Sequence, residues 1–121
     1  MRVIEPYKKF ADARGAFLGI VDSGRWEEVN YIETKAGQSR GGHYHKDTRE
    51  LFFIIEGEIE ISTRDVTEGT AGESATVKKG SIIIVDPNEV HTFTCRTDAK
   101  WINVLSRRMD DRFPDFHRPE D

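Results

Sequence analysis

The sequence predicts an all-β domain folded as a sandwich or barrel. Short runs rich in β-branched and aromatic residues recur at intervals of about ten residues, with Gly, Asp and Pro between them. No stretch of usual helix length shows a clear apolar period of 3.6 residues. At 121 residues the chain is long enough for one hydrophobic core and too short for two, so we expect a single domain over residues 1–121.

The predicted strands run from one turn signal to the next. Taken in chain order, they span residues 16–21, 28–33, 42–46, 51–56, 58–64, 74–77, 82–85, 91–96 and 101–106. After Leu105 the alternation ends and charged residues dominate. We therefore interpret residues 107–121 as an irregular C-terminal tail of the same domain.

Two of these strands indicate how the sheets are covered. In residues 58–62 polar side chains alternate with isoleucines, so one face of that strand contacts solvent. Residues 51–55 are apolar on both faces, and the second face requires cover from elsewhere. A partner subunit is the simplest cover, which favours a homodimer.

Composition and charge narrow the classes of function. The 18 basic and 22 acidic residues are interleaved and give a net charge of −4, which argues against nucleic acid as a partner. The hydrophobic fraction of 36% predicts a thin core, a second reason to expect a partner subunit. No apolar run approaches the roughly 20 residues that span a bilayer. With Cys95 as the single cysteine and no apolar leader near Met1, we expect a cytoplasmic protein.

Three histidines and a glutamate form the candidate metal site. His43 and His45 are separated by one residue, which on a strand places both rings on one face. Glu50 precedes the apolar run at residues 51–55, and a buried carboxylate there needs a cationic partner. His91 begins a later strand and is the fourth candidate. Such a ligand set suits a divalent metal, whether Zn, Fe, Mn, Ni or Cu.

The ordinary reading of a histidine pair with this spacing is a surface feature on a strand. Here a glutamate and a third histidine accompany the pair at fixed offsets, which favours a metal site. His117, in the polar tail, is better explained by tail docking than by metal binding.

The residues around this set resemble the two sequence motifs of the cupins. The first motif, G-x5-H-x-H-x4-E-x6-G, is matched without a gap by Gly37, His43, His45, Glu50 and Gly57. The second motif is matched with departures by Gly80, Pro87 and His91. The departures affect the loop before His91 more than His91 itself. The resemblance implies the cupin fold, a double-stranded β-helix or jelly-roll barrel.

Other stretches narrow the resemblance to cupins that act on sugar nucleotides. Residues 10–17 resemble the F-x-D-x-R-G-x-F opening of the 4-keto-6-deoxyhexose 3,5-epimerases and 3,4-ketoisomerases. Residues 31–46 and 105–117 are similar to stretches of the ketoisomerases. Those ketoisomerases usually lack the glutamate and need no metal. With Glu50 and His91, the chain looks more like the metal-holding cupin domains of capsular-polysaccharide enzymes.

This resemblance implies an isomerase or epimerase acting on a nucleotide-linked 4-keto-6-deoxy sugar in polysaccharide biosynthesis. If a metal occupies the site, Tyr31 is the expected base; in an empty site His43 and His45 are the expected base and acid. Arg40 and Lys46 flank the site and are expected to hold the diphosphate.

Structural interpretations of these flanking residues, without a role in catalysis or binding, also remain open. Tyr31 is also consistent with an ordinary strand residue, and Arg40 and Lys46 with solvated loop charges. Two other functions also remain open: a small-molecule dioxygenase, and a non-catalytic cupin that binds a sugar or an anion.

Overall fold

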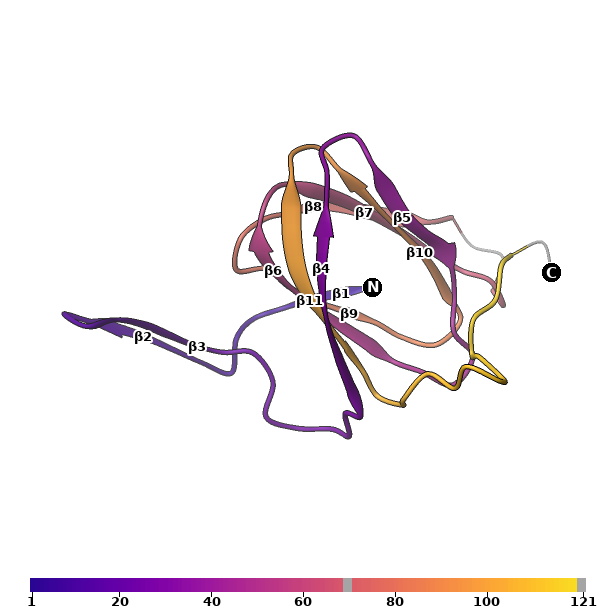
Figure 1. Ribbon diagram of the computed structural model, residues 1–121, viewed down its shortest axis with the longest axis horizontal. Coiled ribbons are helices and arrows are strands. Elements are labelled where there is room, and N and C mark those ends of the chain that lie inside the picture. Colours follow the sequence, from indigo (N-terminus) through magenta and orange to yellow (C-terminus); the bar gives the residue numbers. More distant parts are fainter. Residues whose placement is uncertain (69–70, 120–121) are drawn as a thin grey trace.

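The computed structural model describes residues 1–68 and 71–119, and every strand pairing in this part of the chain is antiparallel. One sheet has the order β1 (Arg2–Ile4), β9 (Ile82–Val85), β6 (Glu50–Glu56), β11 (Ala99–Leu105) and β4 (Glu28–Thr34). The facing sheet has the order β5 (Ser39–His43), β10 (Glu89–Cys95), β7 (Ile59–Asp65) and β8 (Glu73–Val77). A separate hairpin of β2 (Lys8–Asp12) and β3 (Gly15–Gly19) projects away from both sheets (Figure 1).

The predicted all-β class is confirmed, because the described residues contain strands and no helix. Consequently none of the described residues belongs to a helix that could cross a membrane. Two strands were missed from the sequence, β1 and β2. β1 is only three residues long, and all five residues of β2 are exposed, so neither carries an alternating apolar face.

The strand predicted over residues 42–46 is wrong in its extent. β5 begins earlier, at Ser39, and ends at His43, and Tyr44 makes only an isolated bridge with His117. The end of β5 is irregular, because Gly41 and Gly42 adopt φ angles of 111° and 73° and the pairing with β10 shifts register beside them.

The main core lies between the two sheets, where inward side chains alternate with outward ones. On β11 the buried positions are Ala99, Trp101, Asn103 and Leu105. On β7 the isoleucines are buried and the intervening polar residues are exposed, as the alternation predicted. Because both sheets turn their apolar faces inward, any polar side chain on an inward position is enclosed with them. These enclosed polar positions build the candidate site.

The outer face of β6 is covered in part by the chain itself. Leu51 is fully buried in a second apolar cluster, against which Ile20, Val21 and Trp26 from the segment before β4 pack. The sequence argument assigned all of this cover to a partner subunit, and for Leu51 that was wrong. The error arose because the segment between β3 and β4 shows no periodic pattern of its own.

The homodimer itself stays a prediction. Phe10 and Phe17 stack on each other across the projecting hairpin, with ring centroids 5.1 Å apart and nearly half of each side chain exposed. Val29 and Tyr31 are exposed on the outer face of β4, an edge strand. These apolar surfaces are the part of the described chain on which we expect a partner subunit to pack.

Candidate metal centre

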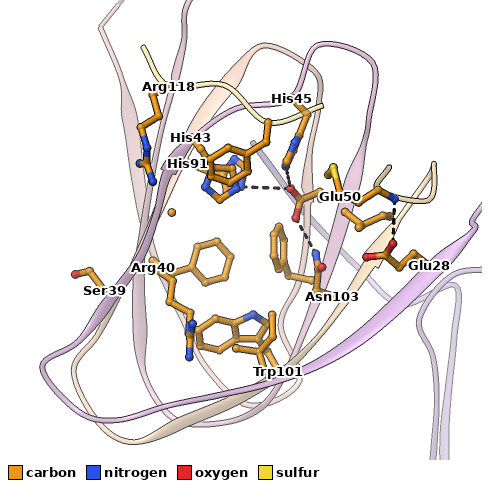
Figure 2. A pocket seen from close by; sticks show the side chains of 17 residues that line it. Glu28, Ser39, Arg40, His43, His45, Glu50, His91, Trp101, Asn103 and Arg118 are labelled. Carbon is orange, nitrogen blue, oxygen red and sulfur yellow. Dashed lines mark hydrogen bonds and ion pairs between the residues drawn. The ribbon is translucent and has the colours of Figure 1, made fainter. Parts of the chain in front are cut away.

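Three histidines and one glutamate meet at one end of the space between the sheets (Figure 2). Their donor atoms all lie within 4.8 Å of one another. The ring centroid of His91 is 4.5 Å from that of His43 and 5.6 Å from that of His45. The structure therefore brings together the four residues that the sequence proposed as a ligand set, and we name them the His/Glu cluster: His43, His45, Glu50 and His91.

Sheet pairing places two of the histidines directly opposite each other. His91 on β10 pairs with His43 at the end of β5, and the register then shifts, so that Thr92 pairs with Gly41. A Cβ atom on Gly41 would collide with the carbonyl oxygen of His91. Only glycine permits this close approach at a positive φ, so Gly41 allows the two strands to converge at the cluster.

Backbone carbonyls orient two of the imidazole rings. The Nδ1 of His91 donates to the carbonyl of Glu89 over 3.1 Å, and the Nδ1 of His45 donates to the carbonyl of Asp115. A neutral imidazole with its proton on Nδ1 presents a lone pair at Nε2. In both rings that Nε2 faces the same oxygen, Oε1 of Glu50. This is the tautomer and orientation that a metal-binding histidine requires.

Asn103 holds the remaining oxygen of Glu50. The amide of Asn103 donates to Glu50 Oε2 over 2.7 Å, which leaves Oε1 directed at the histidines. The same network continues to Asn30, whose amide donates to Asn103 over 3.3 Å and to Glu28 over 2.9 Å. The sequence analysis missed these three residues. Their inward phase on β4 and β11, shared with Ile32 and Trp101, was the signal available.

The residues of the cluster shift one another's pKa values, some upward and some downward. Burial lowers the pKa of His43 to about 4, and the neighbouring histidines add to this effect. Burial also opposes a proton on His45, but the Glu50 carboxylate outweighs it and raises the pKa of His45. Glu50 is only 4% exposed, yet its contacts with the rings of His45 and His91 outweigh burial and hold its pKa well below the usual range. Glu50 is therefore ionised at neutral pH.

The donor set fits a divalent cation. The Nε2 of His45 is buried against Glu50 and makes no hydrogen bond of acceptable geometry. Buried polar atoms are normally satisfied, and a cation between Nε2 and the carboxylate would satisfy both groups at once. Three imidazole nitrogens and one carboxylate oxygen suit Zn, Fe, Mn, Ni or Cu.

The cluster lines a cavity of about 460 Å³. Phe52, Phe93 and Trp101 supply apolar walls, while the exposed side chains of Arg40 and Arg118 mark the mouth. Figure 2 shows both arginines on the side of the cavity away from Glu50. The cavity is thus apolar at its walls and cationic at its entrance.

Tyr31, the base expected from the sequence, does not face this cavity. On β4 the residues Glu28 and Ile32 point inward, and strand alternation places Tyr31 on the opposite face. Its side chain is 56% exposed and its hydroxyl donates to Glu33 over 2.8 Å. This placement argues against Tyr31 as the base in this chain.

The two expected diphosphate-binding residues also differ in position. Arg40 lines the cavity, and its guanidinium donates to Thr34 over 2.7 Å and to the carbonyl of Glu33 over 3.0 Å. Lys46 is exposed and is absent from the described lining of the cavity. It lies in the connection after His45, outside the sheet. Arg118, from the tail, does line the cavity, although the sequence analysis did not propose it as a site residue.

Lowering the pH from about 8 to about 6 is expected to weaken divalent-metal binding. The raised pKa of His45 keeps a proton that competes with the metal, whereas His43, with a pKa of about 4, is neutral throughout this range. Glu50 stays ionised and contributes no pH dependence there. Calorimetric titration with Zn²⁺ in two buffers of different ionisation enthalpy counts the released protons. Affinity that is constant from pH 6 to 8 would contradict the assignment.

The chain is similar in sequence or in structure to several known proteins. It is 28% identical over 104 residues to UDP-2-acetamido-2,6-beta-L-arabino-hexul-4-ose reductase from Pseudomonas aeruginosa, a match that covers 84% of this chain and 28% of that protein. The chain also resembles the capsular polysaccharide assembling protein CapF from Staphylococcus aureus. That structure is 21% identical with a TM-score of 0.70, and the match covers 97% of this chain and 34% of CapF.

A third relative is dTDP-4-dehydrorhamnose 3,5-epimerase from Bacillus anthracis, whose crystal structure has TDP and PPi bound. It is 16% identical with a TM-score of 0.79, and the match covers 91% of this chain and 74% of the epimerase. The two structural likenesses show the fold. The chain spans about a third or less of the length of CapF and of the reductase.

The family assignment rests on a direct sequence match. The cupin domain profile matches residues 30–105, which is more than half of the chain and includes the whole His/Glu cluster. The two facing antiparallel sheets and the inward cluster agree with that match. This chain belongs to the cupin domain family.

Proposed function

We propose that this chain is a metal-dependent isomerase domain acting on a nucleotide-linked 4-keto-6-deoxy sugar in polysaccharide biosynthesis. Its reaction moves a proton at a carbon beside the ketone. The observation that carries the proposal is that the His/Glu cluster and two arginines line the same 460 Å³ cavity. A cavity of this volume lies in the range of small-molecule sites.

The relatives support the substrate class. The name of the Pseudomonas reductase describes a UDP-linked hexul-4-ose, and that of the Bacillus epimerase a dTDP-linked 4-dehydro sugar. Both names describe a sugar with a ketone at carbon 4 and a nucleoside diphosphate. A proton on a carbon beside such a ketone is acidic enough for a side chain to remove it, which suits a site with a buried base.

The His/Glu cluster would hold the divalent cation, which when bound would supply Lewis-acid polarisation of the ketone oxygen. His43 and His45 are then ligands and are not available for proton transfer. They act as base and acid only in a metal-free site, where the lowered pKa of His43 and the raised pKa of His45 suit those two roles.

Glu28 takes the role of base that the sequence assigned to Tyr31. Among the described residues that line the cavity, it is the only carboxylate outside the cluster. Its two oxygens each accept one hydrogen bond, from the Asn30 amide over 2.9 Å and from the Met109 backbone N–H over 3.0 Å. A carboxylate has further lone pairs, so Glu28 can still accept a proton from a bound sugar.

The arginines at the mouth are proposed to hold the diphosphate. Arg40 is oriented by Thr34 and Glu33, and Arg118 lies over the ring of Phe116 at 5.4 Å. Guanidinium groups bind phosphate oxygens by two parallel hydrogen bonds. With the diphosphate at the mouth, the sugar ring extends toward the cluster and the nucleoside lies outside the cavity.

Deuterium exchange tests this function. The purified chain, loaded with Zn²⁺ or another divalent metal, is incubated in deuterium oxide with UDP- or dTDP-linked 4-keto-6-deoxy sugar. We expect deuterium to appear at a carbon beside the ketone with at least one of the two nucleotides. Mass spectrometry and NMR measure this incorporation. NMR of the product also separates epimerisation from migration of the ketone.

Absence of exchange with both nucleotides and every metal tried would overturn the proposal. Oxygen uptake in its place would favour a dioxygenase. Sugar or anion binding without turnover would favour a binding cupin.

A further inference from the structure

The C-terminal tail reaches the His/Glu cluster through residues 115–118, which we name the C-terminal strap. The backbone of the strap joins Tyr44 by two hydrogen bonds, from Tyr44 N to the carbonyl of His117 over 2.9 Å and from His117 N to the carbonyl of Tyr44 over 3.0 Å. The ring of Phe116 stacks on His43 with centroids 4.3 Å apart. The strap therefore lies directly against the segment that carries two of the three histidines.

Asp115 connects the strap to the loop between His45 and Glu50. Its carboxylate accepts hydrogen bonds from the backbone N–H groups of Lys46 and Asp47 and from the hydroxyl of Thr48, each over 2.8 Å. Its backbone carbonyl accepts from Nδ1 of His45. One residue thus holds both the connection between two cluster residues and the ring of one of them.

His45 depends on these contacts more than the other two histidines do. His43 and His91 belong to paired strands, whereas β5 has ended before His45. The backbone of His45 has one further tie, since its carbonyl accepts from the N–H of Asn88 over 2.7 Å. That bond does not set the ring orientation. Among the contacts described, only the carbonyl of Asp115 fixes which nitrogen of His45 carries the proton.

We propose that Asp115 is a positioning residue for the metal site, and that docking of the C-terminal strap and binding of a divalent metal reinforce each other. This inference rests on the metal site of the proposed function. A metal-binding histidine is oriented by the acceptor on its second nitrogen, and loss of such a partner typically costs 10- to 100-fold in metal affinity. By linkage, the bound metal stabilises the docked strap by the same factor.

The first test compares Zn²⁺ affinity in the full-length chain and two variants. Asp115→Ala keeps the backbone carbonyl but removes the three carboxylate hydrogen bonds that hold it beside His45. With the strap undocked, His45 loses its acceptor, and we expect the affinity to fall about 10- to 100-fold. The matched control is Asp111→Ala, which removes an exposed carboxylate from the same tail, and we expect its affinity to stay within about twofold of wild type. Co²⁺ absorption provides a second readout: we expect a changed visible spectrum in Asp115→Ala and an unchanged one in Asp111→Ala.

The second test uses the unaltered chain and so does not depend on a variant that folds. Chymotrypsin cleaves after Phe116, inside the strap. Zn²⁺ is expected to slow that cleavage about 10- to 100-fold in wild type, and to leave it unchanged in Glu50→Gln, which lacks a cluster ligand.

Equal Zn²⁺ affinity in wild type and Asp115→Ala, or equal cleavage with and without Zn²⁺, would overturn the inference while the proposed function stands. Absence of binding of Zn²⁺ and of every other divalent metal tried by wild type would overturn both the inference and the metal-dependent function. If the wild-type chain catalyses deuterium exchange but Zn²⁺ does not protect the strap, the inference fails and the proposed function stands.

Discussion

Glu50→Gln is expected to lower the Zn²⁺ affinity of this chain roughly 100- to 1,000-fold. Structural zinc sites with four ligands bind with about 10–16 kcal/mol, so one ligand of four corresponds to about 2.5–4 kcal/mol. Glu50 is the only carboxylate in the cluster and both partner rings face its Oε1. Glutamine has the same shape and can still accept from Asn103, so the change removes the charge and little else.

The matched control for this change is Glu56→Gln. Glu56 lies at the far end of the same strand, β6, where it is exposed and pairs with Lys100 over 3.6 Å. We expect its metal content and affinity to equal those of wild type, because exposed ion pairs contribute little. Metal content by mass spectrometry and affinity by calorimetry measure the effect. Equal metal in wild type, Glu50→Gln and His45→Ala would remove the cluster as a metal site.

Glu28→Gln is expected to reduce deuterium exchange into the sugar about 100- to 10,000-fold, with Zn²⁺ affinity unchanged within about twofold. General-base catalysis by a positioned side chain contributes a factor of this size, and an amide cannot accept the proton. The distinction between exchange and affinity is informative because Glu28 is linked to Glu50 through Asn30 and Asn103. A merely structural role in that network would weaken metal binding as well.

Two substitutions on the outer face of β4 complete this experiment. Glu33→Gln is the control, because Glu33 is exposed and directed away from the cavity. Tyr31→Phe tests which residue is the base: Glu28, as proposed from the structure, or Tyr31, as expected from the sequence. A large loss of exchange in Tyr31→Phe, together with normal exchange in Glu28→Gln, would restore Tyr31 as the base and contradict its placement outside the cavity.

The cluster and its network explain why a charged group is tolerated in this core. A buried carboxylate without partners is strongly destabilising. Glu50 has the Asn103 amide on one oxygen and two imidazoles beside the other. The same contacts leave Oε1 of Glu50 directed at the two histidine nitrogens. The arrangement that makes burial possible therefore also prepares the donor atom for a cation.

Spacing along the chain sufficed to identify the four cluster residues, although part of the reasoning was incorrect. The histidine pair was expected on one face of a single strand, but the strand ends at His43 and His45 lies beyond it. The set still meets because Glu50 begins β6 and His91 pairs opposite His43. A motif can therefore predict which side chains meet even where the local structure assigned to it is wrong.

The sequence by itself determined the all-β class and the residues of the His/Glu cluster, because strand alternation and short motif spacings are local properties of the chain. Only the tertiary structure decided that Tyr31 faces outward, that Asn103 holds Glu50, and that Asp115 holds His45. The partners in these two contacts are separated by 53 and 70 residues. They meet through sheet pairing and tail docking, for which no local period in the sequence provides a signal.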